Sequence, residues 1–461
     1  MLLLALLLLF MAAAGFAHMT LRKYLRSEEF RVFLSKKVSD AIHAEGQFQP
    51  LLWDGFAVNC NGYEASGGEL VRELRVEDLS TEIGLGGFWR RVWEIRHSQI
   101  RKLDLTLGGL GAPPAAAAPV EPAPPIVAAS PDEGGWLPRE VELKRLDIGE
   151  LVVRAPIEQG MVTMQGTQAK ISSGAGKQSY VVNLNGGTLD VPIKGIPQMR
   201  LDTVRFKVQN GAVFLNQFDA HVWEEGRLAM TGEWDPAVEN RSLQGGVSGV
   251  QCREVLTGDW VKRVSGVAST DFRVVMGGQG TDAQGRLVVE NGVLTALPFL
   301  DALAAYANTK RFRVLQLSEA HTQWQWRDGE LKLTDLVLAS EGLMRVEGSL
   351  TIRGERLDGQ FRVGLAPGTL SSIPGAEEHV FLPGERGLRW APMRVYGTTS
   401  EPKQDLKERM IKAAGRRMLE VLPETGGKVI EATGDVIKGS ADKIIEGGAG
   451  VLNKIFGGGE K

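Results

Sequence analysis

The sequence predicts a mainly β protein with helical segments at both ends. Glycine accounts for 57 of the 461 residues, roughly 12% against a typical ~7%, and follows no collagen-like period. Scattered glycines of this kind are typical of many short strands joined by turns. Apolar and polar residues alternate with period two through most of the chain, and helical spacing is confined to a few segments.

Residues 1–21 are almost entirely apolar and carry no charge, which predicts a membrane anchor. At 1.5 Å per residue a helix of this length reaches across a hydrocarbon core of ~30 Å. A cleaved signal peptide is the alternative, because residues 15–17 fit a small-x-small cleavage pattern. The basic cluster at 22–26 would by itself favour a cytoplasmic body under the positive-inside rule.

Residues 22–107 are expected to form an amphipathic helix followed by the first strands. Apolar residues recur at helical spacing from Ser27, a plausible N-cap, to Glu45. Clean alternation from Leu103 to Leu107 then indicates a strand. The segment 108–136 is rich in proline and alanine, a composition that cannot build a packed core and predicts a linker.

Residues 137–404 again read as strands, interrupted by one helix near 297–308. Asp328-Gly329 and Asn291-Gly292 are predicted turns within this region. Residues 405–461 predict an amphipathic helical tail. Its apolar pairs begin at 429, 436, 444 and 451, and intervals of seven, eight and seven residues keep them on one side of a helix.

The sequence predicts no catalytic, metal-ligating or cofactor-binding residues. It contains no Walker A sequence and no nucleophile elbow, and its six histidines lack metal-binding spacing. The net charge of −3 gives none of the basic character of a nucleic-acid-binding protein. Cys60 and Cys252 do not make a disulfide framework. Two thiols are favoured, and a single bridge in an oxidising compartment is the alternative.

One stretch of the chain resembles a known family. From Gly285 to Leu365 it contains a strand and turn (Gly285–Leu294), a helix opening at Leu297-Pro298, and then strands that include Arg345–Leu350 and Leu357–Phe361. This order is similar to the C-terminal region of the AsmA-like family of bacterial envelope proteins. Residues 19–107 resemble the usual start of those proteins, whereas the proline-rich insert and the basic flank depart from the pattern.

The resemblance implies an elongated, curled antiparallel sheet with an apolar groove, of the kind found in bridge-like lipid carriers. It also implies an inner-membrane, single-pass protein with its body in the periplasm. We therefore expect a non-catalytic protein whose partners are the membrane, phospholipid and possible further envelope proteins. A structural or scaffolding factor for outer-membrane assembly is the first alternative, and a glycan-acting enzyme the second.

Alternation along the predicted strands gives the candidate lining of the groove. For Trp324 and Trp326, ordinary packing of a sheet face is an equally good interpretation. The candidates are Val204, Phe206, Val208, Trp324, Trp326, Leu331, Leu333, Leu350, Ile352, Phe361, Val363 and Leu365.

Overall fold

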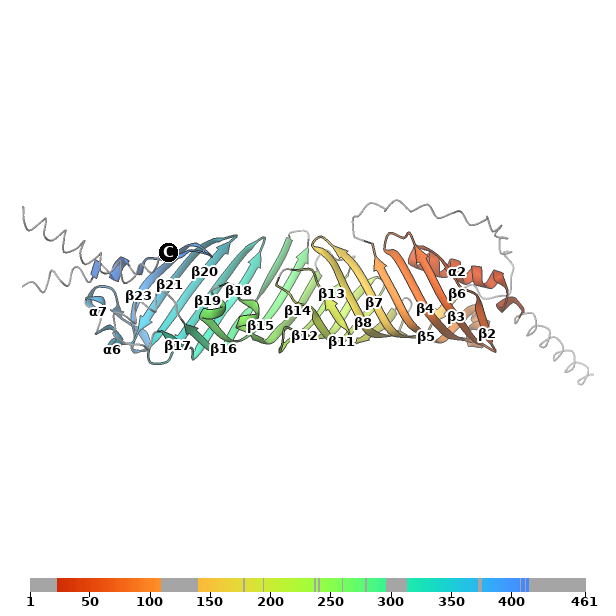
Figure 1. Ribbon diagram of the computed structural model, residues 1–461, viewed down its shortest axis with the longest axis horizontal. Coiled ribbons are helices and arrows are strands. Elements are labelled where there is room, and N and C mark those ends of the chain that lie inside the picture. Colours follow the sequence, from red (N-terminus) through yellow and green to blue (C-terminus); the bar gives the residue numbers. More distant parts are fainter. Residues whose placement is uncertain are drawn as a thin grey trace, which may run out of the picture. The chain divides into compact units, whose positions relative to one another are not determined.

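The computed structural model describes residues 23–413, apart from 109–139, 177–178, 194, 236–237, 239–240, 259, 278–279, 296–312, 372–374, 407 and 411. The chain divides into two compact units. Unit 1 is Met1–Trp223 with Ala229–Ala237, and unit 2 is Glu224–Leu228 with Val238–Lys461. Both are mostly β with few helices (Figure 1), which confirms the mainly β part of the predicted fold class.

Several predicted segments lie outside the described residues. These are the membrane anchor at 1–21, nearly all of the 108–136 linker, the helix near 297–308 and the tail beyond residue 413. Among the described residues, no helix has both the length and the hydropathy needed to cross a membrane.

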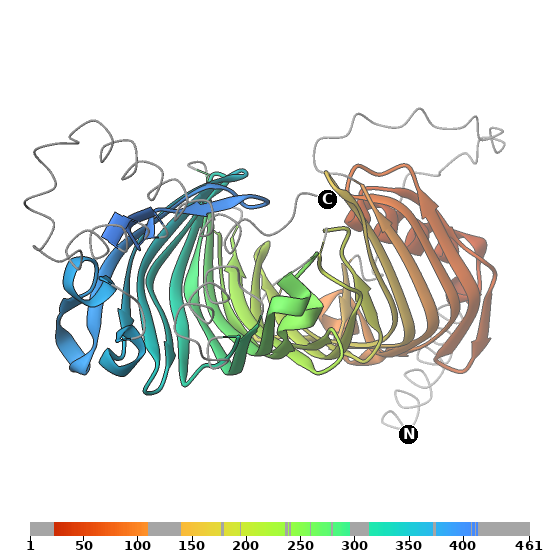
Figure 2. The same cartoon turned by 60° about the vertical axis from the view of Figure 1, so that its left-hand side comes forward.

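In unit 1 the described residues begin with an α-helix, and a curled sheet follows (Figure 2). Helix α2 (Glu28–Ile42) begins after Ser27, whose hydroxyl accepts the backbone N–H of Phe30 as an N-cap. It ends at His43, which takes a left-handed conformation. The strands that follow are β1 (Glu45–Phe48), β2 (Leu51–Asp54), β3 (Ala57–Ser66), β4 (Val71–Gly84), β5 (Val92–Leu107), β6 (Glu140–Leu143), β7 (Arg145–Ile157), β8 (Gly160–Ser173), β9 (Ser179–Asn185), β10 (Thr188–Asp190), β11 (Met199–Gln209) and β12 (Ala212–Val222), with the 3-10 helix η1 (Leu85–Arg90) between β4 and β5.

The sheet of unit 1 is mixed, which corrects the expectation of an antiparallel sheet. Strand β5 pairs with both β6 and β7 in parallel, with Ile100 opposite Ile148. A parallel pair needs a connection of a dozen or more residues to bring the chain back to the starting end of the sheet. The proline-rich stretch lies between β5 and β6 in the sequence, so it occupies the position of this crossover.

In unit 2 the chain forms a curled run of strands with several short helices (Figure 2). Strand β13 (Gly226–Trp234) spans the division between the units. The strands of unit 2 are β14 (Arg241–Gln251), β15 (Val264–Gly277), β16 (Gly280–Thr295), β17 (Val314–Gln316), β18 (Glu319–Arg327), β19 (Glu330–Ser340), β20 (Met344–Arg353), β21 (Arg356–Leu365), β22 (Leu382–Pro383), β23 (Arg389–Thr398) and β24 (Pro402–Gln404). The helices are α3 (Cys252–Val255), α4 (Trp260–Arg263), α6 (Pro367–Leu370), α7 (Ala376–His379) and the 3-10 helix η3 (Glu385–Gly387).

The two glycine-marked turn predictions have different outcomes. Asp328 and Gly329 both have positive φ angles and form the two-residue connection between β18 and β19, as predicted. Asn291 and Gly292 instead lie inside β16. The register with β15 slips by one residue there, so this pair forms a β-bulge rather than a turn.

Each unit has a closed core under its helices. In unit 1, Phe30 of α2 is fully buried among Val58, Ile83 and Trp93. In unit 2, Val363 and Leu365 of β21 are fully buried with Leu370 of α6 and Phe381, which follows α7. In each unit, residues from helices and the segments next to them therefore cover one part of a sheet face.

Candidate functional site: the apolar faces of the two units

In unit 2 the strand register collects apolar side chains on one face of the sheet. Side chains directly opposite each other on neighbouring strands share a face. One continuous row crosses eight strands, from β14 to β23. Its members are Gly245, Phe272, Gly285, Trp324, Leu333, Leu350, Gly359 and Val395.

All nine candidates from unit 2 lie on this face. Trp326, Leu331 and Ile352 form a neighbouring row with Leu357. Phe361, Val363 and Leu365 follow Gly359 at every second residue of β21, so they share its face. We call the surface formed by these rows the unit 2 apolar face.

Glycines on the unit 2 apolar face make room for aromatic rings. Gly285 lies between Phe272 and Trp324 in the register. Trp324 reaches across Gly285, and its indole N–H donates to the Thr270 hydroxyl at 2.9 Å. Gly348 similarly lies opposite Phe361. Part of the high glycine content therefore serves strand interiors, where a bare backbone accommodates a neighbouring ring, as well as turns.

Exposure divides the unit 2 candidates into two groups. Trp324, Leu331, Leu333, Leu350, Ile352 and Phe361 are half-buried, and Trp326 is exposed. Val363 and Leu365 are completely buried and belong to the closed core beneath α6 and α7. These two residues are therefore core positions in the structure, and the uncovered part of the face comprises the other seven.

Unit 1 carries an equivalent apolar row, but it is less exposed. Val204 lies in a row across eight strands, β3 to β12, whose members are Cys60, Leu79, Ile100, Ile148, Ala169, Leu184, Val204 and Phe218. Every member except Leu79 is buried. Phe206 and Val208 lie on the same face and are half-buried. The unit 2 apolar face therefore offers the more accessible surface.

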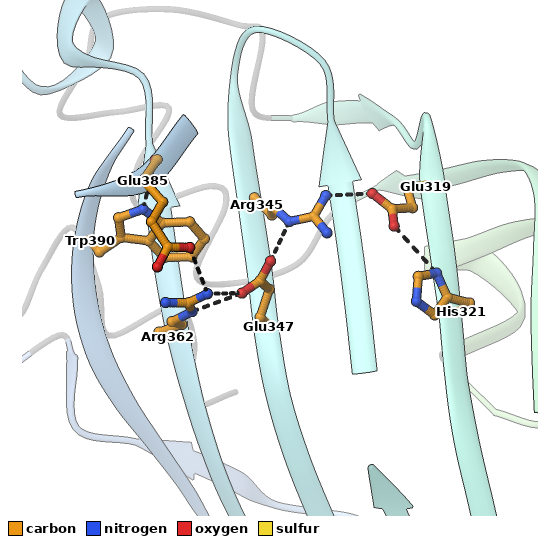
Figure 3. Close-up of polar contacts among 7 residues, drawn as sticks. All are labelled: Glu319, His321, Arg345, Glu347, Arg362, Glu385 and Trp390. Carbon is orange, nitrogen blue, oxygen red and sulfur yellow. Dashed lines mark hydrogen bonds and ion pairs between the residues drawn. The ribbon is translucent and has the colours of Figure 1, made fainter. Parts of the chain in front are cut away.

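The opposite face of unit 2 carries an ion-pair network that sequence reasoning missed (Figure 3). Arg345 of β20 pairs with Glu319 of β18 and with Glu347. Arg362 of β21 donates from Nε to Glu347 at 2.7 Å and lies 3.4 Å from Glu385. These charges come from β18, β20, β21 and η3, and only the folded register brings them together.

Small side chains allow Arg345 to cross an intervening strand. Ala339 of β19 stands in register between Glu319 and Arg345 and is buried. Because Ala339 ends at its Cβ, the arginine extends over it to the next strand. At the β21 end of the network, the indole of Trp390 packs against the Arg362 guanidinium, which lies 4.5 Å from the ring centroid.

The network shifts the pKa values of its carboxyl groups downward. Hydrogen bonding from Arg345 lowers the pKa of Glu319 below its ordinary value. Burial acts to raise the pKa of Glu347, but bonds from Arg345 and Arg362 outweigh it, and the net shift is downward. Both carboxylates therefore stay charged to a lower pH than an ordinary glutamate does.

The two cysteines are free and buried, which confirms the favoured interpretation. Cys60 lies 3.0 Å from the Gly62 carbonyl oxygen, to which its thiol donates. Burial raises the pKa values of both thiols. In the part of the chain that the structure describes, no group of His, Cys, Asp and Glu side chains is arranged to hold a metal ion.

Comparison of the chain with protein-family models, with curated proteins and with solved structures found no match. The AsmA-like resemblance thus remains an expectation from the sequence pattern.

Proposed function

We propose that the protein binds lipid acyl chains on the unit 2 apolar face, and that it serves phospholipid traffic or outer-membrane assembly. The proposal rests on the register row from β14 to β23. In this row, apolar side chains and glycines from eight neighbouring strands share one face of the sheet. Most of these side chains are half-buried rather than sealed.

The dimensions and chemistry of this face suit an acyl chain. Eight strands give seven spacings of about 4.8 Å, or ~34 Å across the row. Burial of hydrocarbon contributes about 0.8 kcal/mol per methylene and needs no specific polar contact. A face lined by leucine, isoleucine and aromatic rings would therefore bind the acyl chains of lipids with different headgroups with similar affinity.

We further propose that the body of the protein lies in the periplasm, anchored in the inner membrane by residues 1–21. The apolar run and the AsmA-like resemblance support this. Single-cysteine labelling tests it with Ser349→Cys, because Ser349 is exposed and both native thiols are buried. A membrane-impermeant maleimide should label Cys at this position in cells whose outer membrane alone has been permeabilised. Labelling that requires lysis of the inner membrane would contradict the topology.

Lipid binding is tested by quantifying phospholipid that copurifies with the detergent-extracted chain. Leu350 and Ser349 are neighbours on β20 that face opposite sides of the sheet. Leu350→Asp should lower the lipid-to-protein ratio severalfold, and Ser349→Asp should leave it unchanged. Circular dichroism of both variants controls for folding. A folded wild-type chain without lipid, or equal ratios in the two variants, would favour the scaffolding function.

A further inference from the structure

The start of the C-terminal tail, residues 405–413, packs against the unit 2 apolar face. Leu406, Met410 and Ala413 are buried in the same core as Val363 and Leu365 of β21. Those two strand residues share a face with Phe361 and the half-buried rows. The chain therefore reaches residue 413 in contact with one end of the face.

This start is fixed to the sheet by polar contacts. The Asp405 carboxylate accepts the backbone N–H of Arg394 on β23 at 2.7 Å, and the Asp405 N–H donates to the Arg394 carbonyl at 3.2 Å. The Arg409 guanidinium lies 3.5 Å from the Asp405 carboxylate. Residues 405–413, which follow β24, are thus held beside β23 and the closed core of unit 2.

The sequence beyond residue 413 matches the face in length and pattern. Its apolar pairs run from Val429 to Leu452, which is 24 residues by the numbering and about 36 Å as a helix at 1.5 Å per residue. The row from β14 to β23 is ~34 Å wide. Charged residues, among them Glu431, Asp435 and Lys438, fall between the pairs on the other side of the helix.

We propose that residues 429–452 dock as an amphipathic helix on the unit 2 apolar face and cover its half-buried rows. The 15 residues from 414 to 428 span at most ~50 Å when extended, so the connection reaches any strand of the face. Glycines within the helix lower its intrinsic stability relative to alanine, which keeps the helix dependent on the face. The covering is consequently reversible, and a ligand of greater apolar area displaces it.

The consequence for lipid rests on the proposed function: the tail competes with acyl chains for the same side chains. The docking itself is independent of lipid and is tested without it. A benzophenone attached through a maleimide to Ile437→Cys, within the apolar stripe, should crosslink on irradiation to side chains of the unit 2 apolar face. The same probe at Asp435→Cys, on the opposite side of the helix, should give no such product. Mass spectrometry locates each adduct.

Truncation after Ala413 provides the second measurement, because it leaves Leu406, Met410 and Ala413 in their core. In the delipidated chain, Leu350→Cys should react with maleimide at least tenfold faster after truncation, and Ser349→Cys should react at an unchanged rate. Adducts from Ile437→Cys outside the apolar face, or equal rates at Leu350→Cys with and without the tail, would overturn the docking. If the adducts form but neither chain length takes up lipid, the docking stands and the proposed function fails.

Discussion

A comparison of Leu365 with Leu350 tests whether the closed core of unit 2 is distinct from the surface proposed to bind lipid. Both are apolar-face leucines on paired strands, but Leu365 has no exposed surface and Leu350 is half-buried. Replacing leucine by alanine removes three carbons, worth about 2.4 kcal/mol when they are fully buried. At Leu365 a cavity among Phe381, Leu370 and Leu406 adds to this, so Leu365→Ala should cost roughly 2.4–5 kcal/mol.

The Leu350 side chain is only partly removed from water, and its truncation leaves no closed cavity. Leu350→Ala should therefore cost less than about 2.4 kcal/mol. Amide hydrogen exchange measures the two effects locally, which matters because a chain with two compact units need not unfold in one step. Since each 1.4 kcal/mol is tenfold, Leu365→Ala should accelerate exchange in β21 and β23 about 50-fold or more, and Leu350→Ala by less than that. Equal acceleration by the two variants would refute the division between core and open face.

Three further predictions concern other parts of the sheet. Because the pKa values of Glu319 and Glu347 are lowered, the contribution of these carboxylates to stability is complete above the ordinary glutamate pKa of about 4.5 and is lost as the pH falls through the folded-state values. Exchange in β18–β21, corrected for intrinsic rates, should therefore rise only on acidification, and Arg345→Met should weaken this dependence, leaving the part that Arg362 contributes at Glu347. Gly285→Val should abolish protection in β15 and β16, because its Cβ would lie 1.9 Å from the Asp271 carbonyl oxygen, whereas Gly368→Ala, with open space around its Cβ, should be neutral. Cys60 and Cys252 should react with a thiol reagent at least a hundredfold more slowly in the folded chain than in urea, and rapid labelling of folded protein would contradict their burial.

Alternation predicted the strands and their faces because it is a local property. Arg205 and Lys207 point away from Val204 and Phe206 whatever strand lies alongside, so the candidate lining could be assigned from sequence. The mainly β class and the hairpin at Asp328-Gly329 followed from equally local signals.

Contacts between distant strands could not be predicted in this way. The parallel pairing of β5 with β7 depends on which strands meet after a long connection. Val363 has the same local pattern as Phe361, and only the packing of Leu370 and Phe381 makes it a core residue. Arg345 reaches Glu319 because Ala339 lies between them, a relation that spans three strands.

The most direct measurement of lipid contact places a photoreactive amino acid on each side of one strand. Leu333 and Lys332 are consecutive on β19, with Leu333 half-buried on the unit 2 apolar face and Lys332 exposed on the other. After irradiation of cells grown with radiolabelled phosphate, the chain carrying the probe at Leu333 should retain labelled phospholipid through denaturing electrophoresis, and the chain carrying it at Lys332 should not. Labelling of equal intensity at both positions, or its absence at Leu333 in folded protein, would contradict acyl-chain binding on the apolar face.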